Sequence, residues 1–313
     1  MVNNASTDNT IDFSKEVWQK LNSPFPLKII NENRPGKGYA VETGYDAAQY
    51  SYILTVDDDN WLQSDYLIEA AKLFQVDAKI GILQGHSTGV FEEEPPAWLK
   101  EVEQFFIIGS PVKESGYFPK DSFYVWGAGM VIKKTDWVYL RSLGFTALTS
   151  KLPGKAAGED NETAIGLLLL GRKIYYSDKL QYQHFMPTDR ISWSKLKQNI
   201  ETTGYVAYYF FLYAFFLDSY SKGNPVTLKA LNFKFFRHWH KLMRPFTLKQ
   251  QIAYWILPRQ EYYQLVLLRQ YSQLKWFLKL QKESLLDINK LQTWVIPLLK
   301  QNPENFKWPY ELE

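Results

Sequence analysis

The chain contains the sequence YILTVDDDN at residues 52–60, a short apolar run that ends in three adjacent carboxylates. A run of this length that is rich in β-branched and aromatic residues predicts a strand buried in a sheet. The carboxylates of Asp57, Asp58 and Asp59 repel one another unless a cation neutralises them. Because Mg²⁺ and Mn²⁺ prefer one or two carboxylates together with the oxygens of a substrate phosphate, the stretch predicts a site for a metal and a diphosphate.

A solvated acidic turn is the alternative interpretation of this stretch. Residues 61–68 suggest a helix, and Asp57 or Asp59 would then cap that helix by accepting hydrogen bonds from its first backbone amides. Taken alone, the stretch leaves both interpretations open.

The segments upstream of the acidic triplet follow a particular order. The polar residues 3–10 precede a helix-like stretch, the strand-like residues 27–30 and a glycine-containing loop at residues 31–40. This order of strand, glycine loop, helix, strand and acids resembles the nucleotide-binding half of a family 2 glycosyltransferase with the GT-A fold. The resemblance implies an α/β fold in which a Rossmann-like mixed sheet binds a sugar nucleotide.

The resemblance also implies roles for individual residues. The acidic triplet corresponds to the DXD-type motif of the family, so Asp57 and Asp59 are the expected contacts to a Mn²⁺ or Mg²⁺ cofactor. Asn3 or Asn4 stands where the family commonly has an Asp that contacts the base. The residues of this half expected to bind the nucleotide are Asn4, Asp8, Arg34, Lys37, Asp57 and Asp58.

A second acidic cluster lies at residues 158–162, where Gly-Glu-Asp-Asn-Glu leads directly into an apolar run and therefore stands at a helix N-terminus. Exposed amides and the helix dipole favour anions there, so capping by Glu159 or Asp160 is one interpretation. The cluster also resembles the Glu-Asp motif of the family, whose second acid removes the proton of the acceptor hydroxyl. The resemblance implies that Asp160 is this general base and that Glu159 orients it or binds the acceptor.

The chemistry of glycosyl transfer needs two separate acidic sites. Displacement of a nucleoside diphosphate from an anomeric carbon places negative charge on the leaving phosphate, so a cation has to lie on that side. A base on the opposite face, with no second nucleophilic acid, gives a single displacement with inversion at the anomeric carbon.

Residues 125–132, VWGAGMVI, form a glycine-broken strand pattern between the two acidic sites. Glycines inside a strand usually mark a bulge or the close approach of another group. In the resembling family this segment lies under the donor sugar, which makes Trp126 and Gly127 candidate sugar contacts. A core tryptophan beside a tight bend is the alternative.

His184 and Arg190 follow a strand-like segment at residues 173–178. An imidazole can complete the shell of a metal, and a guanidinium binds phosphate oxygens in a bidentate manner, so the resemblance places both at the diphosphate. A structural histidine is the alternative. The Gln-x-x-Arg-Trp motif of processive synthases is only echoed by residues 189–193, which favours transfer of one sugar per encounter.

The C-terminal third is basic and aromatic. Between residues 229 and 282 the only acid is Glu261, and lysines and arginines alternate with aromatic residues. This pattern suits either an interfacial helix on an anionic bilayer or a bundle with aromatic residues in its core, and both stay open. No nucleic-acid-binding motif accompanies the charge. Residues 205–217 are uncharged but too few to span a bilayer, so we expect a buried or interfacial linking helix.

The 313 residues include no cysteine and open with polar residues, which excludes disulfides and thiolate metal sites and agrees with a cytoplasmic setting without a signal peptide. We expect a GT-A catalytic domain at residues 1–200 and a helical region at residues 201–313. A typical family member begins with a strand and a helix that form the first wall of the nucleotide pocket, whereas this chain begins at the turn that residues 2–8 resemble. The expected catalytic domain therefore lacks that leading βα unit.

The predicted function is that of an inverting, metal-dependent glycosyltransferase of the hexosyltransferase type. It would move a sugar from a nucleoside-diphosphate sugar to a saccharide or lipid-linked hydroxyl acceptor in cell-surface polysaccharide or glycolipid assembly, in the cytoplasm or on the anionic inner face of the membrane. A catalytically weak binding or scaffolding module in a polysaccharide assembly complex is the alternative, supported by the missing βα unit.

Overall fold

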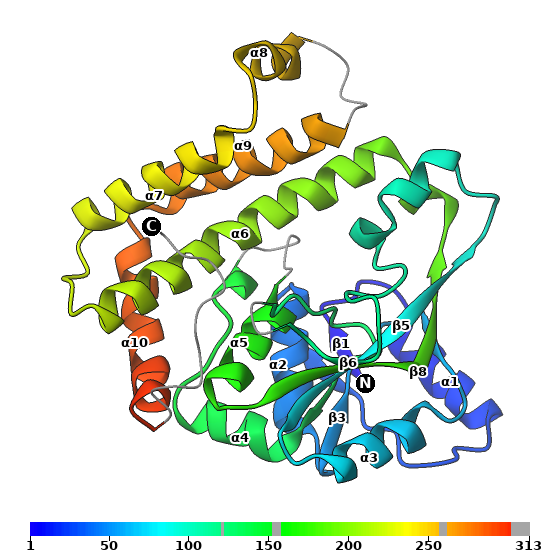
Figure 1. The fold of residues 1–313 in the computed structure, drawn as a ribbon. Coiled ribbons are helices and arrows are strands. Elements are labelled where there is room, and N and C mark those ends of the chain that lie inside the picture. Colours follow the sequence, from blue (N-terminus) through cyan, green and yellow to red (C-terminus); the bar gives the residue numbers. More distant parts are fainter. Residues whose placement is uncertain (120–121, 152–157, 257–261, 302–313) are drawn as a thin grey trace.

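The computed structural model describes residues 1–119, 122–151, 158–256 and 262–301. These residues form a six-stranded mixed sheet with flanking helices, a two-stranded sheet at the N-terminus and a helical C-terminal region (Figure 1). The α/β fold with a mixed sheet and C-terminal helices that the sequence predicts is therefore confirmed.

Two long strands form the centre of the main sheet. β5 (Ile80–Phe91) and β8 (Lys173–Met186) run parallel to each other, and the order across the sheet is β3-β7-β5-β8-β4. The outer strands are short and antiparallel to their neighbours: β3 (Tyr52–Leu54), β7 (Val131–Lys133), β4 (Asn60–Leu62) and β6 (Gly116–Tyr117), which pairs with β8. Ile82 and Leu83 of β5 are fully buried, as expected for a central strand.

The acidic triplet lies in the turn between β3 and β4. Among the described residues β3 is an edge strand that pairs with β7 alone, and the prediction of a strand buried in a sheet holds for Ile53 but not for the exposed Tyr52. Residues 60–62 form β4 rather than a helix, and α3 (Tyr66–Val76) begins after Asp65. Asp57 and Asp59 therefore do not cap a helix, because pairing of β4 with β8 overrides the local helical pattern.

The glycine-broken segment at residues 125–132 is a strand only in its last two residues. β7 begins at Val131, so the prediction of a strand from Val125 is wrong for residues 125–130. Gly129 has a φ of 69°, and a Cβ at that position would lie 2.8 Å from the Tyr66 hydroxyl oxygen. Glycine is required here because it adopts a positive φ at little cost and leaves room for the tyrosine.

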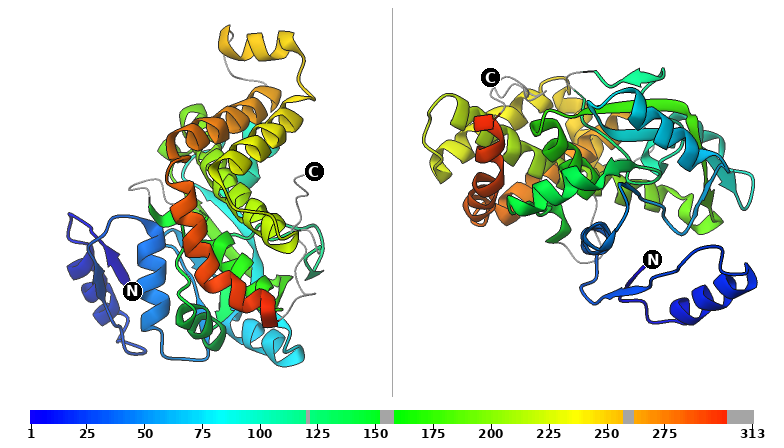
Figure 2. Two further views of the ribbon diagram at one scale, coloured as in Figure 1. Left: turned by 90° about the vertical axis from the view of Figure 1, so that its left-hand side faces the viewer. Right: turned by 90° about the horizontal axis from the view of Figure 1, so that it is seen from below.

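The N-terminal residues form a small unit of their own. β1 (Val2–Asn4) pairs in parallel with β2 (Ile30–Glu32), and α1 (Thr10–Lys20), which connects them, has no buried residue. The strand predicted at residues 27–30 thus begins only at Ile30, and residues 2–4 are a strand rather than part of a turn. α2 (Lys37–Ala47) stands between this unit and the rest of the molecule (Figure 2, left).

The C-terminal region is a bundle around α6 (Trp193–Ser221), which crosses above the sheet, while α7 (Leu228–Met243) and α9 (Tyr262–Leu280) lie on its far side (Figure 1). The rings of Phe235 and Phe277 stack with centroids 3.6 Å apart in the bundle core. α8 (Leu248–Ile256) and α10 (Ser284–Gln301) complete the region. The aromatic residues of this region therefore largely form a bundle core.

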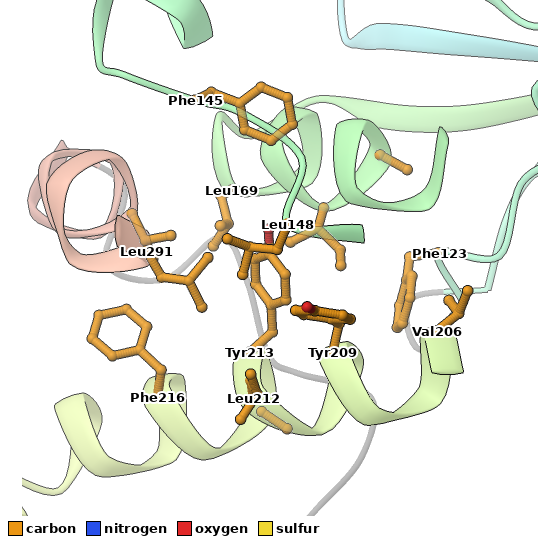
Figure 3. Packing of buried hydrophobic residues seen from close by; sticks show 14 of the residues in the cluster. Phe123, Phe145, Leu148, Leu169, Val206, Tyr209, Leu212, Tyr213, Phe216 and Leu291 are labelled. Carbon is orange, nitrogen blue, oxygen red and sulfur yellow. The ribbon is translucent and has the colours of Figure 1, made fainter. Parts of the chain in front are cut away.

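The bundle and the sheet domain share one hydrophobic core. Tyr209 and Tyr213 of α6 point toward the sheet domain, Phe216 points toward Leu291 of α10, and Leu212 belongs to the same buried cluster (Figure 3). The expected division at residue 200 falls inside α6. Within the described part of the chain, no helix combines the length and the hydropathy needed to cross a bilayer.

Candidate active site

The first acidic site contains a cation, Lys37, that lies at the surface beside Asp57. Lys37, the first residue of α2, donates from Nζ to Oδ2 of Asp57 over 2.7 Å. Burial alone would lower the pKa of Lys37, but the charges of Asp57, Glu159 and Asp160 raise it. Lys37 therefore stays protonated and links the acidic triplet electrostatically to the Glu-Asp cluster, which is about a hundred residues away in sequence.

Asp59 faces the two residues that the sequence predicts for the diphosphate site. In the β4–β8 register Asn60 lies opposite His184, which brings His184 Nε2 to 3.6 Å from Asp59 Oδ2. Arg190, in the short 3₁₀ helix η4 (Thr188–Arg190), forms an ion pair with the same carboxylate. Burial alone would raise the pKa of Asp59, but the hydrogen bonds and charges of His184 and Arg190 lower it to about 2. Asp58 is exposed on the turn.

The donor set fits a divalent cation that is bound jointly with a substrate. Among the described residues, no group of three or more acidic or imidazole side chains could hold a metal ion by itself. Asp59 and His184 offer two adjacent donors, while Asp57 is already paired with Lys37. Mg²⁺ and related ions commonly bind to one or two protein carboxylates and to substrate phosphates. Asp59 and His184 meet this requirement for the protein ligands.

Asp160 is held at the start of α5 (Glu159–Leu169) by hydrogen bonds to both carboxylate oxygens. Oδ2 accepts from the Gly127 N–H over 2.8 Å, and Oδ1 accepts from the backbone and side-chain amides of Asn161, both over 2.7 Å. Burial raises the pKa of Asp160, whereas the charge of Lys37 and these hydrogen bonds lower it. The carboxylate is therefore both fixed in orientation and more basic than an exposed aspartate.

Glu159 occupies a different environment from its neighbour. Its side chain is only 4% exposed, and burial followed by the charge of Asp160 raises its pKa to about 7. Asp160 lines the cavity described below, and Glu159 does not. Glu159 therefore lies beside Asp160 and within the electrostatic influence of Lys37. It does not line the cavity, so the structure does not bring together Glu159 and the expected acceptor.

Two amide side chains that sequence analysis missed hold residues 125–127 beside Asp160. Asn161 accepts from the N–H of Val125 over 3.0 Å and donates to its carbonyl over 3.2 Å. Gln84 of β5 accepts from the N–H of Trp126 over 2.8 Å and donates to its carbonyl over 2.9 Å. With the bond from Gly127 to Asp160, three successive residues are fixed by side chains. A glutamine that directly follows the apolar residues 80–83 of this strand was the available signal.

We expect Gln84→Leu to lower both stability and activity. The substitution leaves the N–H and the carbonyl of Trp126 buried without partners, which costs about 1 to 3 kcal/mol for each group. It also frees the segment that orients Asp160, so kcat should fall. Thermal unfolding and initial rates measure the two effects. Gln183→Leu, at an exposed position of β8, is the control, and equal behaviour of the two variants would show that the Gln84 bonds position nothing.

A cavity of about 520 Å³ opens in front of Asp160. Of the residues that the sequence predicts for the site, Trp126, His184 and Arg190 line it together with Asp160. His184 and Arg190 also contact Asp59, so they join the acidic triplet to the cavity. Trp126 is 2% exposed and serves both as a core residue and as part of the cavity wall. Gly127 lies beside Asp160 but outside the lining.

The predicted nucleotide-binding residues near the N-terminus are only partly brought together. Asn4 accepts from the Gly36 N–H over 2.8 Å and donates to the carbonyl of Arg34 over 2.7 Å. Arg34 binds Glu32 through two hydrogen bonds, and these bonds hold the pKa of Glu32 at about 2. Glu32 was missed in the sequence. Asp8 is exposed and accepts hydrogen bonds only from Thr10 among the described residues.

The comparison with protein families bears on the N-terminal half of the chain. Residues 1–140 match glycosyl transferase family 2. The family expected from the sequence is thus confirmed over these residues, and the match supports glycosyl transfer as the class of reaction. The segment includes the acidic triplet, Lys37 and Trp126 but ends before Asp160 and His184.

Two solved structures have a similar overall arrangement at 14% sequence identity each. The first is the crystal structure of S. aureus TarS, with a TM-score of 0.45, where the similarity covers 92% of this chain and 48% of that one. The second is GalNAc-T7 with UDP, GalNAc and Mn²⁺, with a TM-score of 0.47 and coverage of 89% and 49%. The chain therefore spans about half the length of each. No curated protein matches the chain significantly.

Proposed function

We propose that the chain is an inverting, metal-dependent glycosyltransferase that moves a sugar from a nucleoside-diphosphate sugar to a hydroxyl acceptor. One observation carries the proposal: the half-buried carboxylate of Asp160, fixed by Gly127 and Asn161, lines a cavity whose wall also holds His184 and Arg190. This arrangement supports the proposal, because a single displacement requires a base and diphosphate-binding side chains at one cavity. The family match over residues 1–140 supports the same class of reaction.

The leaving group would bind on the side of the acidic triplet. Arg190 offers a guanidinium to phosphate oxygens, and Lys37 adds a second positive charge nearby. A divalent cation, when bound with the diphosphate by Asp59 and His184, supplies charge neutralisation to the leaving phosphate. Without it, the carboxylates of residues 57–59 and the diphosphate would repel each other at close range.

The acceptor would bind on the side of Asp160. As the acceptor hydroxyl attacks the anomeric carbon, Asp160 takes its proton, and the sugar-phosphate bond breaks on the opposite face. General-base catalysis of this kind contributes about a hundred- to ten-thousand-fold in rate. Since Asp160 is the carboxylate in the described lining of the cavity, no second acid there offers itself as a nucleophile, and the sugar is inverted.

The donor nucleotide would extend from the cavity toward the N-terminal unit. We place the nucleoside near Asn4 and Arg34, which the hydrogen bonds to Gly36 and Glu32 hold in one cluster. Asp8 stays a proposed nucleotide contact, and in the structure its carboxylate accepts hydrogen bonds from Thr10. Trp126 and Gly127 remain proposed contacts of the donor sugar, the first as part of the cavity wall and the second through its position beside Asp160.

Incubation with a panel of nucleoside-diphosphate sugars and Mn²⁺ or Mg²⁺ tests the proposal. Release of nucleoside diphosphate in the presence of saccharide acceptors, measured with a coupled assay, supports glycosyl transfer. Donor binding without any release under all conditions would instead favour the alternative of a binding or scaffolding module in polysaccharide assembly.

We also propose a cytoplasmic location at an anionic membrane surface, in keeping with a role in cell-surface polysaccharide or glycolipid assembly. Phe233 and Phe236 of α7 are 65% and 46% exposed in a basic region of the chain. Exposed aromatic and basic side chains together favour an interfacial position, where each Lys or Arg near the surface contributes about 1 kcal/mol.

Co-sedimentation with vesicles tests the membrane proposal. The protein should bind anionic vesicles, be released as salt rises, and bind less after neutralisation of the exposed Lys275, Lys279 and Lys282. Neutralisation of Lys15 and Lys20 on α1, compared with neutralisation of Lys275 and Lys279 alone, is the control with an equal loss of two charges. Equal binding to anionic and zwitterionic vesicles would contradict the proposal.

A further inference from the structure

The wall of the cavity opposite the sheet is one face of α6. Lys195, Gln198, Asn199, Thr202, Val206 and Phe210 recur at spacings of three and four residues and line the cavity together. The face is polar toward the N-terminal end of the helix and apolar toward residue 210. A molecule bound at Asp160 would therefore face polar side chains at one end of this wall and apolar side chains at the other.

The charges on the cavity wall are unbalanced. Within the described lining, Asp160 is the only acid, whereas Arg190, Lys195 and Arg269 carry positive charge. Arg190 is already paired with Asp59. Lys195 and Arg269 form no ion pair with any residue that the structure describes. Two cations on the cavity wall are thus available to a ligand.

Tyr124 lies on the cavity wall and is acted on by the charges of both Asp160 and Arg269. Desolvation of the Tyr124 hydroxyl and the charge of Asp160 raise the pKa of this group to about 12, whereas the charge of Arg269 lowers it. All three side chains line the cavity. The guanidinium of Arg269 and the carboxylate of Asp160 therefore both act on the space in front of Tyr124.

This arrangement discriminates between neutral and anionic acceptors. Asp160 has to be ionised to act as a base, so it repels an anionic group on the acceptor unless cations lie nearby. A neutral saccharide needs no such compensation and would leave Lys195 and Arg269 without partners. Guanidinium and ammonium groups bind phosphate and carboxylate strongly in partly enclosed sites.

We propose that the acceptor of this transferase is anionic: a phosphate or carboxylate group binds Lys195 and Arg269 while a hydroxyl of the same molecule lies at Asp160. The inference rests on the proposed function and adds the substrate class to it. The transfer itself is unchanged, since the acceptor oxygen forms the new bond to the anomeric carbon, the bond to the diphosphate breaks, and the proton passes to Asp160.

Matched acceptor pairs test this proposal. Glycerol 3-phosphate is compared with glycerol, and methyl glucuronoside with methyl glucoside, at a fixed donor concentration, so the two arms separate phosphate from carboxylate. In the phosphate pair, the carboxylate pair or both, the anionic acceptor should have a kcat/KM at least about tenfold higher than its neutral counterpart. Lys195→Gln and Arg269→Gln should each reduce this preference about tenfold, and Lys195→Arg and Arg269→Lys should largely preserve it.

Two variants serve as controls for the loss of a positive charge. Lys197 lies on α6 next to the lining residues, and Arg244 is exposed after α7, and neither lines the cavity. Lys197→Gln and Arg244→Gln should leave the preference for anionic acceptors unchanged. A similar loss of preference in these controls would show a general effect of charge and would overturn the proposed site.

The remaining outcomes separate this inference from the proposed function. Turnover with equal kcat/KM for charged and neutral acceptors in both arms would overturn the anionic acceptor and leave glycosyl transfer intact. A rise in the KM of the donor rather than of the acceptor in Lys195→Gln would assign Lys195 to the diphosphate and would also overturn it. Hydrolysis of the donor by water needs no acceptor anion, so failure of both hydrolysis and transfer would refute the function itself.

Discussion

Asp160→Asn should lower kcat by about a hundred- to ten-thousand-fold while donor binding changes little, because an amide cannot accept the proton of the acceptor hydroxyl. Its amino group must also face either the Gly127 N–H or the two Asn161 amides, so at least one donor loses its acceptor. Removal of a partly buried charge offsets part of that loss. Steady-state kinetics together with calorimetry of donor binding separate the chemical step from binding.

Glu159→Gln is the matched comparison for this variant. Glu159 is the neighbouring buried acid, and it does not line the cavity, so its substitution should reduce the rate far less than that of Asp160. If Glu159→Gln lost activity and Asp160→Asn retained it, the general base would be Glu159 and the assignment made from the cavity would be wrong.

Asp59→Ala should weaken Mn²⁺-dependent donor binding by about a hundredfold, which corresponds to about 2.7 kcal/mol. The variant removes the carboxylate that His184 and Arg190 face and that would hold the cation with His184. Donor binding measured by calorimetry in Mn²⁺ should fall to the level that the unchanged protein shows in excess chelator. In chelator, the variant and the unchanged protein should then bind equally weakly.

Asp65→Ala provides the control for loss of one negative charge near this turn. Asp65 is exposed and precedes α3 without a side-chain capping bond, so donor affinity should stay as it is in the unchanged protein. Full donor affinity of the unchanged protein in chelator would contradict a role for a metal, and full affinity of Asp59→Ala in Mn²⁺ would contradict the role of Asp59.

The sequence predicted the side chains of the site better than the strands that carry them. Asp59, His184 and Arg190 come together as expected, although Asp59 is far from the other two in the chain. Their residue types follow from the chemistry of a diphosphate site, so the motif identifies them without knowledge of the fold. β4 was missed because its three residues become a strand only by pairing with β8, which a local pattern does not reveal.

The residues that hold Asp160 and its neighbouring segment in place could not be predicted from residue type. Gln84 and Asn161 act through the backbone of Val125 and Trp126, and these contacts exist only because residues 125–127 run between β5 and α5. β3 illustrates the same limit, because its apolar pattern is that of a buried strand although it pairs on one side only. The pattern of apolar residues indicates which side chains avoid water. It does not indicate with how many other strands the segment pairs.

The anomeric configuration of the product tests the central claim most directly. Asp160 is the one acid in the described wall of the cavity, and if it acts as the general base of a single displacement, the sugar is inverted relative to the donor. Proton NMR of the product, read from the coupling constant of the anomeric proton before any mutarotation, distinguishes the two outcomes. We predict a β-linked product from an α-linked donor. A product that retains the donor configuration would contradict Asp160 as the base of a single displacement.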